Sequence, residues 1–103
     1  MRVDLRDGQW AELRERISHG ADKRIRLMRH RGSTDPDALL ETGDLLIREF
    51  VTAWHVLDVD GSAIPLGDAD ATDRLPEDIA DVIIDAAAEL YNGATVPNVP
   101  TPD

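Results

Sequence analysis

Asp58, Asp60 and Ser62 have the spacing with which a calcium-binding loop begins, and their oxygens are of the kind that calcium prefers. Such a loop also needs glycine at its sixth position and a bidentate glutamate at its twelfth. Counted from Asp58, those positions hold Ala63 and Ala69. We therefore interpret the two aspartates as acidic turn residues and expect no metal to bind there.

The histidines and serines form no recognisable catalytic or metal-binding pattern. His19, His30 and His55 lack the His-Glu-x-x-His spacing of a zinc helix, and the chain has no cysteine to supply a thiolate. None of the serines stands in a Gly-x-Ser-x-Gly turn, which would expose it as a nucleophile. We therefore expect a protein that is not an enzyme and that uses no cofactor.

Charge is distributed unevenly along the 103 residues, whose formal net charge is -10. Residues 1–31 carry nine Lys/Arg against five Asp/Glu, whereas residues 32–103 carry two Arg against sixteen Asp/Glu. The first segment is therefore net +4 and the second net -14. Seven of the cations lie between Arg14 and Arg31, where only two acidic residues oppose them.

Three explanations of this basic segment remain open. It can contact nucleic acid, although a net charge of -10 opposes long-range attraction to DNA. It can dock on the acidic helices of its own chain, or it can bind a partner that presents a negative face. In each case Lys23, Arg24 and Arg26 are the candidate contact residues.

The hydrophobic pattern predicts an α+β domain that is mostly helical, with an N-terminal β-hairpin and about three helices. Residues 3–13 alternate between apolar and polar around Asp7-Gly8, a dipeptide typical of two-residue type I′ turns. Residues 21–31 carry a helical stripe, and we expect Gly32 to end that helix as a C′ glycine.

The strongest helical pattern covers residues 36–54. We expect Asp35 to cap this helix and Pro36 to occupy its first position. Gly43 lies beside the apolar stripe and is expected to admit a neighbouring helix closely. The stripe consists of Leu39, Leu40, Leu46, Ile47, Phe50, Val51 and Trp54.

The second half of the chain is less regular. Residues 55–66 fit either a small hairpin or an extended excursion, and residues 68–73 fit a short helix. The last helix is expected to begin at Pro76 and to end at Asn92-Gly93. We expect a compact domain over residues 1–93 and a Pro-rich flexible tail over residues 94–103. The apolar stripe of the last helix consists of Ile79, Val82, Ile83, Ala86 and Leu90.

One segment resembles a known family. Residues 4–14, Asp-Leu-Arg-Asp-Gly-Gln-Trp-Ala-Glu-Leu-Arg, are similar to the start of tail assembly chaperones from long-tailed, siphovirus-type actinobacteriophages and prophages. The order of the following elements is also similar, including an apolar segment that ends in tryptophan, here residues 43–54, Gly-Asp-Leu-Leu-Ile-Arg-Glu-Phe-Val-Thr-Ala-Trp.

The resemblance implies a non-enzymatic role in tail morphogenesis. It implies binding to tape-measure and/or tail-tube proteins, and location in the host cytoplasm. The matching segments make Trp10, Phe50 and Trp54 candidate partner contacts beside the three cations named above. A homo-oligomer is also compatible with the sequence, whereas we do not expect nucleic acid or a membrane as partners.

Two alternatives remain from other functional classes. The first is a structural component of the phage particle, such as a minor tail or head–tail connector protein. The second is an acidic inhibitor that mimics DNA, which the composition of residues 68–103 suggests.

No run of 18 apolar residues or apolar leader is visible, so we expect a cytoplasmic protein.

Overall fold

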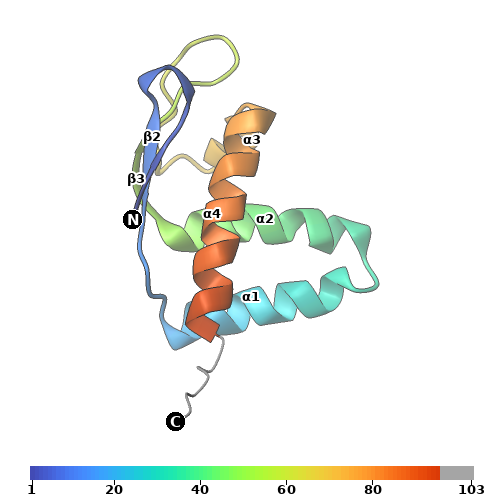
Figure 1. Ribbon diagram of the computed structural model, residues 1–103. Coiled ribbons are helices and arrows are strands. Elements are labelled where there is room, and N and C mark those ends of the chain that lie inside the picture. Colours follow the sequence, from blue (N-terminus) through green and yellow to red (C-terminus); the bar gives the residue numbers. More distant parts are fainter. Residues whose placement is uncertain (96–103) are drawn as a thin grey trace.

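The computed structural model describes residues 1–95 and confirms the predicted α+β class, with three long helices beside a small sheet (Figure 1). The sheet is antiparallel, with its strands in the order β1-β2-β3. In chain order the elements are β1 (Arg2–Asp4), the 3-10 turn η1 (Arg6–Gly8), β2 (Trp10–Leu13), α1 (His19–Gly32), α2 (Pro36–Phe50), β3 (Val51–His55), α3 (Ala71–Arg74) and α4 (Glu77–Thr95).

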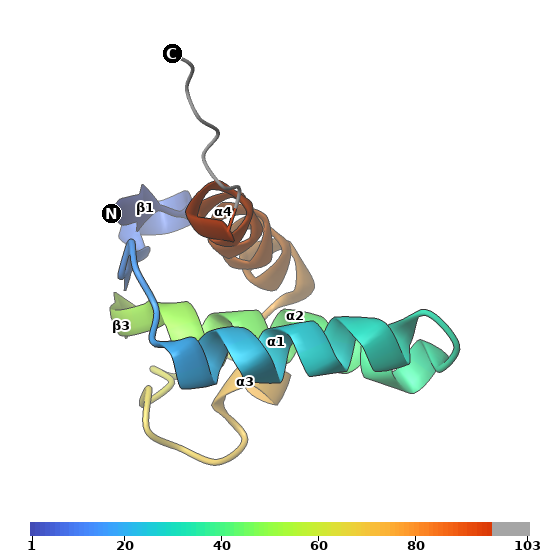
Figure 2. The ribbon, with the colours of Figure 1, turned by 90° about the horizontal axis from the view of Figure 1, so that it is seen from below.

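Helix α2 is the centre of the domain. Helix α1 runs beside it, while α4 crosses one face of α2 and α3 lies on the opposite face (Figure 2). The sheet continues from the end of α2 and covers the end of the helical layer (Figure 1). The side chains that are almost completely buried come from both the sheet and the helices: Leu13, Ile25, Ile47, Phe50, Val56, Ile79 and Ile83.

The N-terminal hairpin forms as predicted, with one difference in its turn. Asp7 and Gly8 both have positive φ, and the Gln9 N–H donates to the Arg6 carbonyl oxygen, as in a type I′ turn. The last register pair joins Asp4 to Trp10, however, so five residues, 5–9, connect the strands instead of the expected two. The strand β2 ends at Leu13 and does not continue directly into a helix.

The predicted helix over residues 36–54 is too long by four residues. The expected cap is confirmed, because an Asp35 carboxylate oxygen accepts from the Asp37 N–H at 3.0 Å. The helix ends at Phe50, and residues 51–55 form β3. These residues include β-branched and aromatic side chains, which favour strands, and β2 offers them a hydrogen-bonding edge.

Helix α1 is longer than predicted and ends differently. Ser18 caps it, since the Ser18 hydroxyl accepts from the Ala21 N–H at 3.1 Å. Gly32 is the last helical residue and has no positive φ, so the expected C′ role is wrong. A β-carbon at Gly32 would instead lie 3.2 Å from the Leu39 Cα, so glycine allows the two helices to approach closely where the chain turns.

Three residues of the predicted apolar stripes are exposed. Leu39 and Leu40 are 62% and 77% exposed, because α2 extends beyond the point where α4 crosses it (Figure 1). Val82 is 45% exposed, since α4 buries a face with a spacing of four residues, which runs from Ile79 through Ile83 to Tyr91. Helix α4 continues to Thr95, past the predicted end at Asn92-Gly93, and residues 96–103 of the predicted tail lie outside the described residues.

The segment between β3 and α4 combines both predicted alternatives. A single bridge between Leu57 and Ala63 closes a small hairpin, in which Gly61 has a φ of 91°. An extended stretch follows, and the predicted short helix begins at Ala71 instead of Asp68. This segment returns the chain to α2 and forms one wall of the site described below.

Candidate functional site

The six residues predicted to contact a partner do not form one surface. Trp10 and Trp54 lie on opposite faces of the sheet, because Trp54 is paired with Ala11, the neighbour of Trp10. Trp10 is partly exposed, and the guanidinium carbon of Arg2 lies 4.8 Å from the centroid of its ring. Trp10 therefore belongs to the outer face of the sheet, apart from Trp54.

The predicted cations of α1 differ in their surroundings. The Arg24 guanidinium lies 2.8 Å from the Glu49 carboxylate of α2, so this pair joins the two helices. Arg26 pairs with Asp22 of its own helix at 3.0 Å. Lys23 is exposed and forms no ion pair within residues 1–95. Of the three explanations of the basic segment, docking within the chain is therefore realised at Arg24.

Phe50 is completely buried and unavailable to a partner in this fold. Its ring meets the Tyr91 ring edge-on, with centroids 6.4 Å apart and planes at 83°. This contact holds the end of α2 against the C-terminal half of α4. The physical role of Phe50 is therefore in the core.

Trp54 lines an open groove, which we call the Trp54 groove. It has a volume of about 440 Å³ and lies between the end of α2, strand β3 and the segment that leads into α3. Its lining is mostly apolar: Ile47, Arg48, Val51, Trp54, Leu66, Gly67, Asp68, Ala69, Ala71 and Thr72. Its size is within the range of pockets that bind small ligands or anchor side chains.

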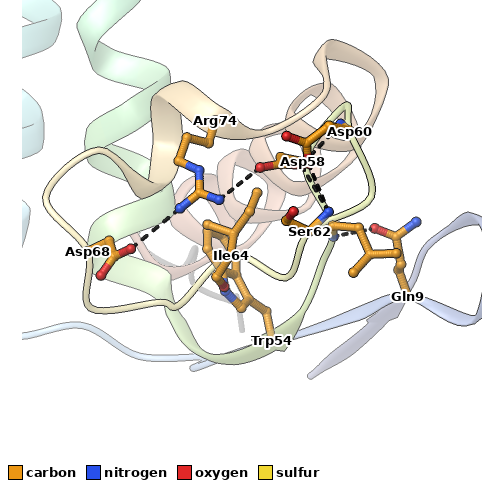
Figure 3. A network of polar contacts seen from close by, with 9 residues as sticks. Gln9, Trp54, Asp58, Asp60, Ser62, Ile64, Asp68 and Arg74 are labelled. Atoms are coloured by element: carbon orange, nitrogen blue, oxygen red, sulfur yellow. Dashed lines mark hydrogen bonds and ion pairs between the residues drawn. The ribbon is translucent and has the colours of Figure 1, made fainter.

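Hydrogen bonds fix the aromatic wall and the opposite wall of the groove (Figure 3). The Trp54 indole N–H donates to the Ile64 carbonyl oxygen at 2.8 Å, which sets the orientation of the ring. Arg74 contacts two aspartates of the loop, Asp58 at 2.8 Å and Asp68 at 3.5 Å. Because Asp68 lines the groove, Arg74 connects the groove wall to α3.

The turn behind this wall is held by the same aspartate. One Asp58 carboxylate oxygen accepts from the N–H groups of Asp60 and Ser62, both at 3.1 Å (Figure 3). Hydrogen bonding with Asp60, followed by the Arg74 ion pair, holds the pKa of Asp58 well below its usual range. The buried Gln9 side chain accepts from the Leu57 N–H at 2.8 Å and attaches the loop to the hairpin. These aspartates thus serve as turn residues, as predicted.

Acidic side chains gather beside the groove. Burial, followed by the nearby charge of Asp73, raises the pKa of Asp44, and the charge of Glu41 acts in the same direction. Arg48 partly opposes this effect. Asp44 lies one helical turn before Arg48, and Asp73 follows the lining residue Thr72. The groove thus combines an apolar floor with a rim on which negative charge predominates.

A second cavity, of about 660 Å³, lies between the β2–α1 connection and the end of α4. Its lining alternates in charge, with Glu15, Asp22 and Glu89 opposing Arg16 and Arg26. The Ser18 hydroxyl there is engaged as the cap of α1, so the nearby His19 does not face a free nucleophile. We therefore consider the Trp54 groove the better candidate site.

The described part of the chain contains no cluster of three or more His, Asp or Glu residues that could hold a metal ion. Among the helices of residues 1–95, none combines the length and apolar character that a bilayer crossing requires. The arrangement of the Trp54 groove is suited to binding: it offers apolar surface and charge.

No protein family, curated protein or solved structure matches this chain. The interpretation of the groove therefore rests on the residues themselves. Of the groove-lining residues, sequence reasoning identified only Trp54 as a candidate contact. Leu66 carried a signal that could have been used, because it is a large apolar residue in a polar segment between Pro65 and Gly67.

Proposed function

We propose that this protein is a non-enzymatic tail assembly chaperone of a long-tailed actinobacteriophage or prophage. In this role it binds tape-measure and/or tail-tube proteins in the host cytoplasm before the tail polymerises. The observation that carries the proposal is the Trp54 groove, an open and mostly apolar surface on a small domain with a net charge of -10. Apolar surface binds exposed client segments, and high charge keeps the complex in solution.

The resemblance of residues 4–14 to the family supports the phage context. Those residues comprise the last residue of β1, η1 and all of β2, the strand that pairs with β3 and so supports the strand carrying Trp54. The similar segment at residues 43–54 supplies the C-terminal half of α2 and the groove residues Ile47 and Val51. Both similar segments therefore contribute to the fold around one candidate site.

Co-expression with a tape-measure protein of a long-tailed actinobacteriophage tests the proposal. We expect tape-measure fragments to stay soluble and to co-elute with the protein during gel filtration. Fragments that are equally soluble with and without the protein would contradict it. A tape-measure gene directly downstream, with an overlapping frame, would independently support the phage context.

Mass spectrometry of mature virions distinguishes the chaperone from the alternative, a structural component of the particle. A chaperone is expected to be missing from purified particles, whereas a minor tail or connector protein is present in stoichiometric amounts. Because the two roles predict opposite results, a single preparation of virions distinguishes them.

One observation favours the DNA-mimic alternative. Helix α4 presents exposed carboxylates at intervals of four residues, from Glu77 through Asp81 and Asp85 to Glu89. Helical rise separates them by about 6 Å each, and DNA carries two strands of charge, with one charge per ~1.7 Å of its axis. This single row imitates at most one strand, and we rank the mimic below the chaperone. Salt-sensitive binding to a DNA-handling enzyme would reverse that order.

A further inference from the structure

We infer that the Trp54 groove binds a Lys/Arg-rich segment of a partner protein that carries large apolar anchor side chains. The inference rests on the proposed function in one respect, namely that the protein binds a protein partner. It goes further by assigning the contact surface and the chemistry of the segment. The physical basis is the combination of apolar floor, acidic rim and fixed walls in one place.

The Trp54 groove exists before a partner binds. The Trp54 indole is held by the Ile64 carbonyl, and the opposite wall is held by the contacts of Arg74 with Asp58 and Asp68. A partner therefore does not have to order this loop or turn the tryptophan ring. Preformed walls reduce the entropic cost of binding.

The groove also exposes large apolar side chains. Leu66 is 37% exposed and faces the groove, as does the partly exposed Trp54. Covering such side chains removes apolar surface from water, which contributes roughly 25 cal/mol for each Å². Tryptophan is also enriched among the residues that dominate binding energies at protein interfaces. An occupant with large apolar side chains is therefore favoured over a purely polar one.

The charge around the groove favours a cationic occupant. Asp44 and Asp73 lie beside the groove against the cation Arg48, while Asp68, which lines it, is already paired with Arg74. The net charge of -10 extends this local excess to long range, so that cationic partners are attracted and anionic ones repelled. A basic segment also relieves the mutual repulsion of Asp44 and Asp73.

A second copy of the chain is a weaker candidate for the same groove. Helix α1 does present an exposed leucine, Leu27, between the cations Lys23 and Arg31 at the preceding and following turns. However, each copy carries the same charge of -10, which opposes their approach. The groove is therefore better matched to a different, cationic protein.

Fluorescence of Trp54 provides a direct test. In the Trp10→Phe variant Trp54 is the only tryptophan, so its emission reports on the groove. The probe is a 20-residue peptide of leucine and lysine with helical periodicity, and a leucine–glutamate peptide of the same pattern is its counterpart. We expect the lysine peptide to shift Trp54 emission and to protect it from acrylamide, and the glutamate peptide to have no effect.

Two pairs of variants locate the contact. We expect Leu66→Ser to weaken binding of the lysine peptide about tenfold, the effect of losing roughly 1.4 kcal/mol, whereas Leu40→Ser, at an exposed leucine outside the groove, leaves it unchanged. The double variant Asp44→Asn/Asp73→Asn should weaken binding of the lysine peptide several-fold at low salt. The control of equal charge, Asp81→Asn with Asp85→Asn on α4, should weaken it less.

Equal effects of the two charge pairs, or full binding by Leu66→Ser, would overturn the inference. So would sedimentation of the protein alone as a dimer that Leu66→Ser converts to a monomer, because the occupant would then be a second copy. If tape-measure fragments still co-elute with Leu66→Ser, the groove assignment fails while the proposed function stands. If they never co-elute with the wild type but the lysine peptide binds in the groove, the proposed function fails and the groove assignment stands.

Discussion

The side chain of Ile84 occupies the space that a β-carbon on Gly43 would need. The Ile84 Cδ1 atom would lie only 2.8 Å from that carbon, closer than real contacts allow. Gly43 is therefore the point at which α4 approaches the backbone of α2. This close approach places both helices over the same core, next to the strand that carries Trp54.

Gly43→Ala should destabilise the domain by up to about 2 kcal/mol. Overpacking of a core costs roughly 1–3 kcal/mol, and alanine returns at most about 1 kcal/mol through its helix propensity. Urea unfolding measures the difference. Ile84→Val removes the clashing methyl group and should restore most of the loss in the double variant.

Gly93→Ala is the matched control for that experiment, because a β-carbon at Gly93 meets nothing within 4 Å. It should leave the free energy of unfolding unchanged or raise it slightly. If both glycine substitutions had the same effect, the close approach of α4 to α2 would not be the reason for Gly43.

Asp58→Asn should remove a pH-dependent part of the stability. The pKa of Asp58 is lowered in the folded protein, so its contribution is fully present above the unfolded pKa of about 3.9 and is lost as the pH falls through the folded value. The difference in unfolding free energy between wild type and variant should therefore be largest near pH 7 and should shrink at pH 3. A difference that does not change with pH would contradict this role of the hydrogen bonding with Asp60 and of the ion pair with Arg74.

Tyr91→Phe should cost about 1 kcal/mol of stability, the usual net contribution of a hydrogen bond. The Tyr91 hydroxyl donates to an Asp22 carboxylate oxygen at 2.7 Å, and the ring itself is 2% exposed. This hydrogen bond is the largest cause that lowers the pKa of Asp22, so the variant should also lose less stability on acidification than the wild type. Thermal unfolding at pH 7 and pH 3.5 checks both statements.

Arg24→Glu should lower the melting temperature, because it places a second carboxylate beside Glu49, whose oxygen lies 2.8 Å from the arginine. Lys23→Glu makes the same change of charge one residue earlier, at an exposed side chain with no ion pair in residues 1–95, and should have a smaller effect. The exchanged pair, Arg24→Glu with Glu49→Arg, should recover the loss. Failure of the exchange would mean that this pair does not hold α1 on α2.

The sequence predicted the helical faces better than the ends of the elements. The Asp35 cap and the Asp7-Gly8 turn depend on local chemistry and were found, and the close approach at Gly43 followed from its place beside an apolar stripe. The strand after Phe50 was missed, because residues 51–54 continue the helical spacing and only the unpaired edge of β2 turns them into a strand. Tertiary context here outweighs local periodicity.

The candidate site was predicted only in part, for a similar reason. Trp54 was named from its position at the end of an apolar stripe, whereas Leu66 and Ala71 reach the groove through a long loop. That loop is positioned by Arg74 and Gln9, whose partners are 16 and 48 residues away in the chain. Contacts over such separations leave no periodic signal in the sequence.

Light scattering of a purified tape-measure fragment from the same genome tests the central claim most directly. The fragment is diluted from denaturant into buffer with increasing amounts of this protein, and the turbidity is followed with time. The account predicts that aggregation is suppressed in a stoichiometric manner by the wild type and much less by Leu66→Ser. Turbidity that is the same with the wild type and without any protein would contradict it.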